Sequence, residues 1–231
     1  MTQLIVDGIS KQYNDKTALY SFTMHAEPGS CIVLCGGNGA GKSTMIHIVA
    51  GISLPKTGTV KVGDTDMNGS RKEYLKKIGY MPDDYHAQET LSVGEFLRFY
   101  ASIRQVPAER VDTVLDMIGL AEQRTDLVRS LSKGMKQRLL FGQSILSDPE
   151  LLVMDEPTNG LDPFWVDRFI SILKELKDKG TIILFSTHMM DVAAEIGTDI
   201  LFMREGVVKE RLDSTMAFGE KISRLIKLHR N

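Results

Sequence analysis

The amino-acid sequence predicts an α/β fold with a mostly parallel core sheet, an N-terminal antiparallel β subdomain and an inserted helical subdomain. Three apolar runs, at Cys31–Cys35, Leu151–Met154 and 181–185, have the length of fully buried strands, and 200–203 is a further candidate. Stretches with helical spacing of apolar residues separate these runs. Because strands that alternate with helices form parallel sheets, we expect a single α/β domain over residues 1–231.

The N-terminal part of the chain is rich in short β-type runs. They cover residues 4–6, 17–25 and Thr57–Val62, and Gly, Asn, Asp and Pro residues separate them. These runs predict the small antiparallel sheet.

Residues 90–147 have helical periodicity instead. Ser92 and Glu95 fit a capping box, which predicts that a helix begins there. Gly119 is expected to end a second helix. The apolar residues expected on the buried faces of these helices are Phe96, Leu97, Tyr100 and Ile103, then Val111, Val114, Leu115 and Ile118, and later Leu139, Leu140, Ile145 and Leu146. This block would form the inserted helical subdomain.

Two further helices are expected in the second half of the chain. Asp162 and Pro163 fit the cap and first position of a helix that Gly180 would end. The C-terminal tail, residues 211–231, is basic and weakly amphipathic, with apolar Ile222, Leu225 and Ile226 facing basic Lys221, Arg224 and Lys227. We expect a surface helix docked on its own domain. Contact with a membrane surface or a partner protein is the alternative.

Bulk composition excludes several classes of protein. The net charge is −2, so no nucleic-acid partner is expected, since such partners select a basic surface. No apolar run approaches the ~20 residues that span a bilayer, and the first seven residues do not resemble a signal peptide. The chain is therefore expected in the cytoplasm, where it would reach a membrane only through a partner.

Two cysteines, Cys31 and Cys35, lie in one apolar run. On a strand they would share a face, too far apart along it for an easy disulfide. A metal site would need further ligands nearby. We therefore interpret them as small buried apolar residues.

A glycine-rich segment follows the first buried run. Residues 36–43 match G-x-x-x-x-G-K-[ST] at every fixed position, with an apolar, helix-like stretch after them. Such a loop curls so that its backbone N–H groups point at phosphates, and the helix N-terminus adds positive potential. We expect Lys42 to reach the β- and γ-phosphates of ATP and Ser43 to bind Mg²⁺. The expected nucleotide-binding residues are Gly36, Gly37, Asn38, Gly39, Ala40, Gly41, Lys42, Ser43 and Thr44.

Two carboxylates end the apolar run at Leu151–Met154. Asp155 would face the nucleotide and hold Mg²⁺, directly or through water. Glu156 follows and would point differently. We expect it to act as the general base that polarises the attacking water.

The remaining motifs resemble one family. Residues 131–138, Leu-Ser-Lys-Gly-Met-Lys-Gln-Arg, resemble the signature segment of the nucleotide-binding subunits of ABC (ATP-binding cassette) transporters. Residues 155–163 resemble the family's second Walker motif running into its D-loop. His188 stands where the family has its switch histidine, and Tyr13 matches the aromatic residue that stacks on adenine. The resemblance covers residues from about 4 to 210 and implies a P-loop NTPase fold.

This resemblance implies a shared mechanism. Two ATP-binding subunits, identical or different, would form a head-to-tail dimer around two ATP molecules. Ser132 and the backbone at Gly134 would contact the γ-phosphate held by the partner subunit's Lys42. His188 would contact the γ-phosphate and help orient the water held by Glu156, while Asp162 would communicate across the dimer. A membrane permease would hold the chain at the cytoplasmic face of the cell membrane.

The sequence departs from the family pattern at two places. The signature reads Ser-Lys-Gly-Met instead of the common Ser-Gly-Gly-Gln. Many members have Gln where this chain has Asp83, and this residue begins the loop that couples to the permease. We hypothesise that Asp83 still reaches the Mg²⁺ shell. Both variants resemble the branch of exporters with separate permease subunits, which handle drugs, antibiotic peptides, sodium or haem.

Other functions are weighed against this one. A soluble ABC-type ATPase acting on DNA or ribosomes usually has a long coiled coil or two cassettes, for which this chain has no room. A P-loop kinase or GTPase would not explain the signature segment or His188. A binding-only module would not need Glu156. An importer ATPase subunit remains an alternative, and the transported substrate is not specified by the sequence.

Overall fold

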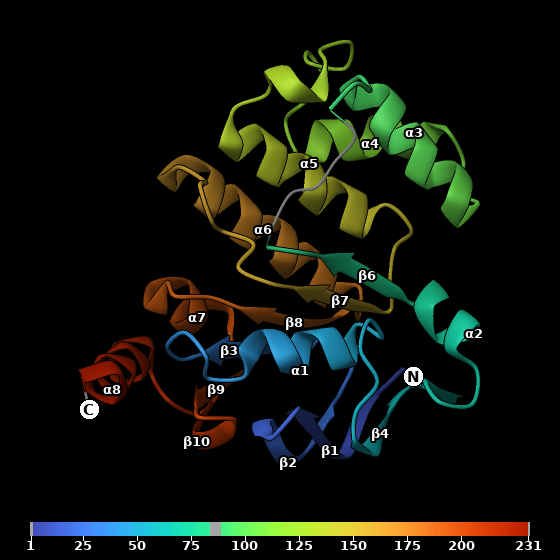
Figure 1. The fold of residues 1–231 in the computed structure, drawn as a ribbon. Helices are drawn as coiled ribbons and strands as arrows, with labels where there is room; N and C mark the ends of the chain where they lie inside the picture. The colour runs from blue at the N-terminus through green and yellow to red at the C-terminus, as the bar shows by residue number, and fades with distance from the viewer. Residues whose placement is uncertain (1, 84–88, 231) are drawn as a thin grey trace.

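The core of the structure is a six-stranded sheet (Figure 1). The computed structural model describes residues 2–83 and 89–230. In spatial order the strands are β10 (Val207–Asp213), β9 (Asp199–Arg204), β3 (Cys31–Cys35), β8 (Ile182–Ser186), β7 (Leu151–Met154) and β6 (Ile78–Met81). The five strands from β9 to β6 run parallel, and β10 pairs antiparallel with β9. The predicted α/β class with a mostly parallel core sheet is confirmed.

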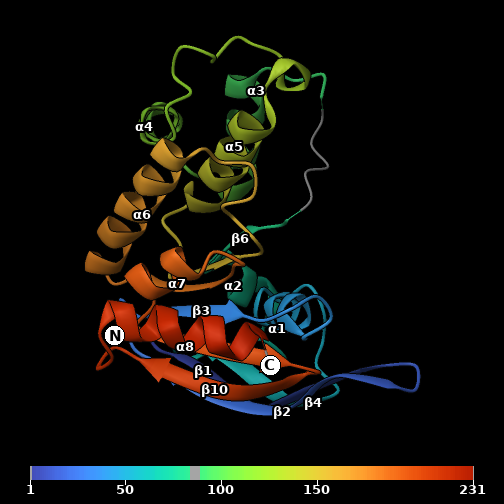
Figure 2. The same cartoon turned by 90° about the vertical axis from the view of Figure 1, so that its left-hand side faces the viewer.

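A second, antiparallel sheet lies below the core sheet in Figure 2. Its strands, in spatial order, are β2 (Lys16–Ala26), β1 (Leu4–Tyr13), β4 (Thr57–Val62) and β5 (Thr65–Asp66). Helix α1 (Lys42–Val49) lies between the two sheets, and its apolar side chains join residues of both in one buried cluster. The predicted N-terminal β subdomain is therefore present.

The core sheet is buried on both faces, as its continuous apolar strands predicted. Along β3, Val33 packs with the helices on one face, while Ile32 and Leu34 pack with α1 and the second sheet on the other. Cys31 and Cys35 are buried free thiols on the helix-covered face, and desolvation raises the pKa of both to about 12. Both are therefore unreactive packing residues, as expected.

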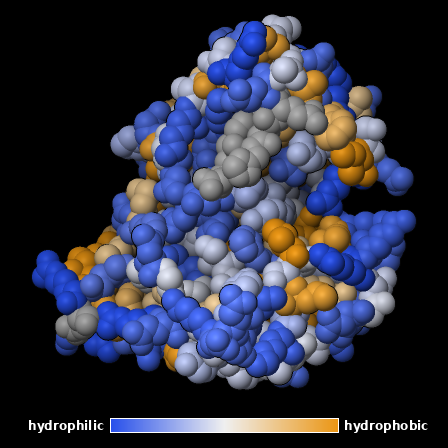
Figure 3. Space-filling model, viewed as in Figure 1, coloured by the Kyte–Doolittle hydropathy of each residue, from blue (hydrophilic) through white to orange (hydrophobic). Residues whose placement is uncertain are grey.

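Helices cover the face of the core sheet that lies away from α1 (Figures 1 and 2). They are α3 (Val93–Arg104), α4 (Glu109–Met117), α5 (Lys133–Ile145), α6 (Pro163–Asp178), α7 (Met190–Ile196) and α8 (Phe218–Arg230), with a 3₁₀ turn at Val128–Ser130. The short helix α2 (Arg71–Lys76) lies on the side of α1, where Tyr74 packs in the cluster that joins the two sheets. The capping box at the start of α3 is present, because Ser92 Oγ accepts from the Glu95 N–H at 3.3 Å and Glu95 accepts from the Ser92 N–H at 2.8 Å. Among the described residues, no helix is long and apolar enough to cross a bilayer. The face of the molecule seen in Figure 3 is mostly hydrophilic, with apolar residues in small separate patches.

Two predicted apolar faces are wrong in detail. Ile103, expected on the buried face of α3, is 61% exposed. On α8, Leu225 is fully buried, but so is Lys221, while Ile226 is 37% exposed. The Lys221 ammonium donates to the Gly197 carbonyl at 3.0 Å, just beyond the end of α7. A long side chain that reaches a carbonyl can replace an apolar one at a buried position.

Candidate active site

Three neighbouring parallel strands bring the predicted motifs together. β8 lies between β3 and β7, and each of the three ends at the same edge of the sheet. β3 leads into the glycine-rich loop, β7 into Asp155 and Glu156, and β8 into Thr187 and His188. A cleft of about 850 Å³ opens at this edge. Its lining includes Tyr13, Asn38, Gly39, Ala40, Gly41, Lys42, Ser43, Thr44, Asp83, Asp155, Glu156 and His188.

The loop requires glycine at different positions for different structural reasons. A Cβ on Gly36 would lie 2.2 Å from the Met203 carbonyl oxygen, and one on Gly41 would lie 2.7 Å from that of Ala18. Gly39 needs glycine for its conformation, with φ of +75°. Gly37 has no such φ, and no atom lies within 4 Å of an added Cβ. The space at Gly37 and Gly39 is what a backbone cradle for phosphate requires.

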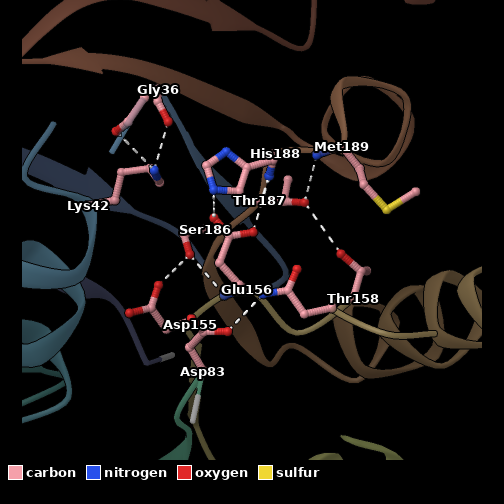
Figure 4. A network of polar contacts seen from close by, with 12 residues as sticks. Gly36, Lys42, Asp83, Asp155, Glu156, Thr158, Ser186, Thr187, His188 and Met189 are labelled. Atoms are coloured by element: carbon pink, nitrogen blue, oxygen red, sulfur yellow. Dashed lines mark hydrogen bonds and ion pairs between the residues drawn. The ribbon is translucent and has the colours of Figure 1, made fainter. Parts of the chain in front are cut away.

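Lys42 is poised within this cradle. It begins α1 and is 7% exposed, and its ammonium donates to the carbonyls of Gly36 at 2.7 Å and Gly37 at 3.3 Å (Figure 4). Carbonyl oxygens of a loop are neutral acceptors, so a phosphate oxygen would be a stronger partner for this cation.

Ser186, at the end of β8, joins the two carboxylate residues of β7. Its hydroxyl donates to Asp155 Oδ1 at 2.5 Å and accepts from the Glu156 N–H at 2.9 Å (Figure 4). Asp155 and Glu156 are 5% and 6% exposed, and Glu156 has a left-handed backbone with φ of +47°. This unusual conformation is why adjacent carboxylates can both face the cleft. Ser186 was not predicted as a site residue, although its hydroxyl at the end of a buried apolar run was a signal for one.

The two carboxylate oxygens of Glu156 differ. Oε2 accepts from the backbone N–H of His188 at 3.2 Å. Oε1 lies 3.0 Å from Nε2 of His188, yet the hydrogen-bond geometry is not satisfied, so this buried oxygen has no hydrogen-bond partner among the described residues. Buried oxygens are usually paired. Oε1 thus has an unused acceptor position at the wall of the cleft.

Burial also changes the proton affinity of this pair. Desolvation raises the pKa of Glu156 to about 7; Lys42 and the His188 N–H oppose the rise, and Asp155 and Asp83 add to it. Desolvation is likewise the largest cause that lowers the pKa of His188, and Lys42 lowers it further. His188 is therefore a neutral imidazole at pH 7. A carboxylate with a pKa near neutrality suits general base chemistry.

Asp83, at the end of β6, lines the same cleft. Its Oδ1 accepts from the Asn159 amide at 2.8 Å, which ties the end of β6 to the loop after β7 (Figure 4). The segment expected to couple to a permease continues into residues 84–88, which lie outside the described residues.

The opposite end of the cleft is partly aromatic. Tyr13 ends β1 and is 49% exposed, and Tyr20 of β2 is 55% exposed. Exposed aromatic rings beside a phosphate cradle suit stacking on a nucleobase. Tyr20 on β2 and Glu205 in the turn between β9 and β10 also line the cleft but were not expected, because both lie outside any motif.

Five predicted nucleotide contacts do not line this cleft: Gly36 and Gly37, whose carbonyls accept from Lys42, and Ser132, Gly134 and Asp162. Ser132 caps α5 by accepting from the Met135 N–H at 3.2 Å, and Asp162 caps α6 by accepting from the Trp165 N–H at 2.9 Å. A Cβ on Gly134 would lie 2.8 Å from the Gly160 carbonyl oxygen, so the signature segment packs on the D-loop. Their roles in nucleotide binding stay predictions.

The donor set of the cleft fits Mg²⁺. The Ser43 hydroxyl and the carboxylates of Asp155 and Asp83 supply only oxygen atoms, which this hard cation prefers. In residues 2–83 and 89–230 no group of three or more His, Cys, Asp or Glu could hold a metal alone. This is compatible with Mg²⁺, which is usually held by one or two carboxylates together with substrate phosphates and water.

Comparison with known proteins decides the family. Residues 19–159 match the family model described as ABC transporter. The chain belongs to the ABC transporter family. Like other ATP-binding subunits of ABC transporters, it is an ATPase.

Several relatives of this ABC transporter subunit are similar over most of its length. The Nod factor export ATP-binding protein I of Rhizobium etli is 33% identical over 210 residues, which are 89% of this chain and 66% of that protein. The bacitracin transport ATP-binding protein BcrA of Enterococcus faecalis is 31% identical over 209 residues, 90% of this chain and 68% of that protein. The chain thus spans about two thirds of these relatives.

Solved structures agree with this assignment. An ATP-binding subunit of an ABC transporter superposes with a TM-score of 0.87 at 26% identity, covering 96% of this chain and 99% of that one. A bacterial ABC transporter cassette solved as a dimer has a TM-score of 0.84 at 22% identity, covering 91% and 98%. At this lower identity the likeness concerns the fold.

Proposed function

We propose that this chain powers export across a membrane as a Mg²⁺-dependent ATPase subunit that pairs with a second ATP-binding subunit and a separate permease. The observation that carries the catalytic part is the unpaired Oε1 of Glu156, buried at a cleft that also holds Lys42. The names of the relatives for Nod factor export and bacitracin transport support the exporter assignment.

The hydrolytic step follows from the residues of the cleft. Glu156 Oε1 accepts a proton from a water molecule as the water oxygen attacks the γ-phosphorus, and the bond to the β–γ bridging oxygen breaks. Lys42 neutralises charge on the β- and γ-phosphates. His188, neutral and 3.0 Å from Glu156, can donate from its ring to a γ-phosphate oxygen. Mg²⁺ held by Ser43, Asp155 and Asp83 would offset further negative charge on the phosphates.

The dimer part rests on where the signature segment lies. Ser132 is exposed and stands at the N-terminus of α5, outside the chain's own cleft. A 13-residue helix directs its free N–H groups and positive end outward. A second subunit in a head-to-tail arrangement would bring its bound γ-phosphate to this helix end.

The test is Glu156→Gln, which keeps the shape of the side chain but removes the base. We expect ATP hydrolysis to fall at least 100-fold, while ATP binding persists and ATP shifts the variant to a stable dimer in size-exclusion chromatography. Glu122→Gln, at an exposed position, is the matched control and should behave as the wild type. Hydrolysis at the wild-type rate by Glu156→Gln would disprove the catalytic assignment.

The transport part needs a separate measurement. A tagged chain isolated from detergent-solubilised membranes should carry with it an integral membrane protein with several spanning helices. Reconstitution of the two in vesicles should couple ATP hydrolysis to substrate movement away from the ATP-binding face. Recovery with ribosomes and no membrane protein would contradict the transporter assignment.

A further inference from the structure

Gln137 is a buried polar residue that no part of the mechanism above uses. It lies in α5, 5% exposed, one turn beyond the signature segment's Ser132 and Gly134. Its Nε2 donates to the carbonyl oxygens of Glu156 and Pro157, each at 3.2 Å. Both partners are acceptors, so only an NH₂ group satisfies them.

The carbonyl that Gln137 holds belongs to the residue with the strained backbone. Glu156 has φ of +47°, a region that residues other than glycine rarely adopt and that persists only where surrounding contacts enforce it. Ser186 of β8 fixes the N–H of Glu156 at 2.9 Å. Gln137 and the Asn159 N–H, at 3.1 Å, fix its carbonyl from the other side. The peptide groups on both sides of the Glu156 Cα are therefore clamped by different elements.

Water cannot replace the Gln137 amide. The space beside it is about 10 Å³, and its lining includes Phe141, Trp165, Phe169 and Ile172. This is at or below the smallest volume that holds a water molecule, and its walls are largely apolar. Removal of the NH₂ group therefore takes this donor from the buried Pro157 carbonyl and leaves the Glu156 carbonyl with only the Asn159 N–H, which a change of the loop backbone would relieve.

We propose that Gln137 is a positioning residue for ATP hydrolysis, which holds the left-handed backbone of Glu156 and so aims its carboxylate into the cleft. Because Gln137 and Ser132 are on one helix, this contact also joins the segment expected to meet a second subunit's nucleotide to the chain's own base. The inference rests on the proposed catalytic role of Glu156. It adds a connection within one subunit between two regions: the signature segment, expected to meet the partner subunit's nucleotide, and the base that acts on the chain's own nucleotide.

Two substitutions test this role in the full chain. Gln137→Met keeps the length of the side chain and removes the donor. Gln137→Glu keeps its shape but places a carboxylate next to two carbonyl oxygens, which repel it. We expect both to lower kcat at least tenfold while the Kd for ATP stays within about twofold. Hydrogen exchange should rise at the amides of Glu156, Thr158 and Asn159 and stay unchanged in β3 and α1.

The control variant is Ser144→Ala. Ser144 is also buried on α5, but its hydroxyl donates to Phe141 of its own helix at 2.7 Å. It should keep kcat and the exchange pattern of the wild type. If Gln137→Met does not fold, Gln137→Asn, smaller and neutral, takes its place, with kcat calculated per folded chain.

Glu156→Gln in the same assay separates two kinds of failure. If Glu156→Gln is inactive while folded Gln137 variants keep kcat within twofold of the wild type, the positioning role is wrong. It is also wrong if kcat and ATP affinity fall together by equal factors, which indicates general loss of structure. If Glu156→Gln itself hydrolyses ATP normally, the proposed function fails first.

Discussion

The backbone N–H of His188 donates to Oε2 of Glu156 at 3.2 Å, while the ring Nε2 of the same histidine lies 3.0 Å from Oε1. One residue thus contacts both oxygens of the carboxylate through two different groups. The backbone contact fixes the orientation of the carboxylate, because a main-chain donor cannot rotate away. The ring is half exposed and can turn towards a ligand in the cleft.

Removal of the His188 ring should therefore affect the chemical step more than ATP binding. The backbone donor survives in His188→Ala, so we expect kcat to fall about 100- to 1,000-fold, the range for loss of one positioned donor, with a Kd for ATP within threefold of the wild type. Steady-state phosphate release and equilibrium titration with a fluorescent ATP analogue give the two values. His25→Ala, at an exposed position, is the control. Equal losses in both values would contradict this division of roles.

The raised pKa of Glu156 predicts a specific pH dependence of stability. Between pH 4.5 and about 7 the folded chain keeps a proton on Glu156 that the unfolded chain has lost, so the folded state is weakened as pH rises. Glu156→Gln does not titrate. Its free energy of unfolding relative to the wild type should rise across this window, by an amount on the order of 3 kcal/mol, and then level off.

Urea unfolding at several pH values, with a chelator and without nucleotide, measures this difference. The comparison between the two chains cancels all other titrating groups. A difference that is constant from pH 4.5 to 8 would show that Glu156 titrates normally in the folded chain.

Gly36 and Gly37 should respond differently to the same added methyl group. Gly36→Ala places a Cβ 2.2 Å from a backbone oxygen of β9, so we expect a loss of more than about 3 kcal/mol in unfolding free energy. Gly37→Ala meets no atom within 4 Å, so stability should change by less than about 1 kcal/mol. Its methyl group would instead occupy space at the cradle and weaken ATP binding at least tenfold. Urea unfolding and ATP titration would contradict this if the two variants behave alike.

Asp83 should matter for Mg²⁺ if it reaches the metal shell. In Asp83→Gln the charge is lost, so the Mg²⁺ concentration for half-maximal hydrolysis should rise severalfold at saturating ATP. Asp64→Asn, at an exposed position in the turn between β4 and β5, is the control. An unchanged Mg²⁺ dependence would remove Asp83 from the set of metal-binding residues.

The docking of α8 gives a prediction about stability alone. Leu225 is fully buried, whereas Ile226 on the same helix is 37% exposed. Leu225→Ala should lower the unfolding free energy by about 2 to 4 kcal/mol, and Ile226→Ala by less than about 1 kcal/mol. Urea unfolding compares the pair directly. Similar losses from the two would show that α8 packs through a different face.

The location of the site could be predicted because it follows from strand ends. Once 31–35, 151–154 and 181–185 are identified as buried parallel strands, the residues after each must meet at one edge of the sheet. That rule brings Lys42, Asp155 and His188 together without any knowledge of the sheet order. The order, with β8 between β3 and β7, depends on helix packing that local patterns do not encode.

Other features required the structure because they depend on contacts between distant segments. Gln137 and Glu156 are 19 residues apart and belong to different elements, and although Gln137 is part of the signature segment, no local pattern links it to Glu156. The prediction of the buried face of α8 was wrong because Lys221 reaches a carbonyl 24 residues away in the sequence. Periodicity assigns the buried face of a helix from the polarity of its residues. That assignment fails where a long polar side chain is buried because it reaches a distant hydrogen-bond partner.

At position 156, the residue that catalysis requires is not the residue that best stabilises the left-handed backbone. Glycine or asparagine would adopt that φ with less strain, and neither would bury a carboxylate beside Asp155. Selection of a variant library for thermal stability alone should therefore enrich Gly or Asn at residue 156, and every such variant would lack ATP hydrolysis. A more stable variant that keeps its activity would therefore need Glu156 unchanged and stabilising substitutions at other positions.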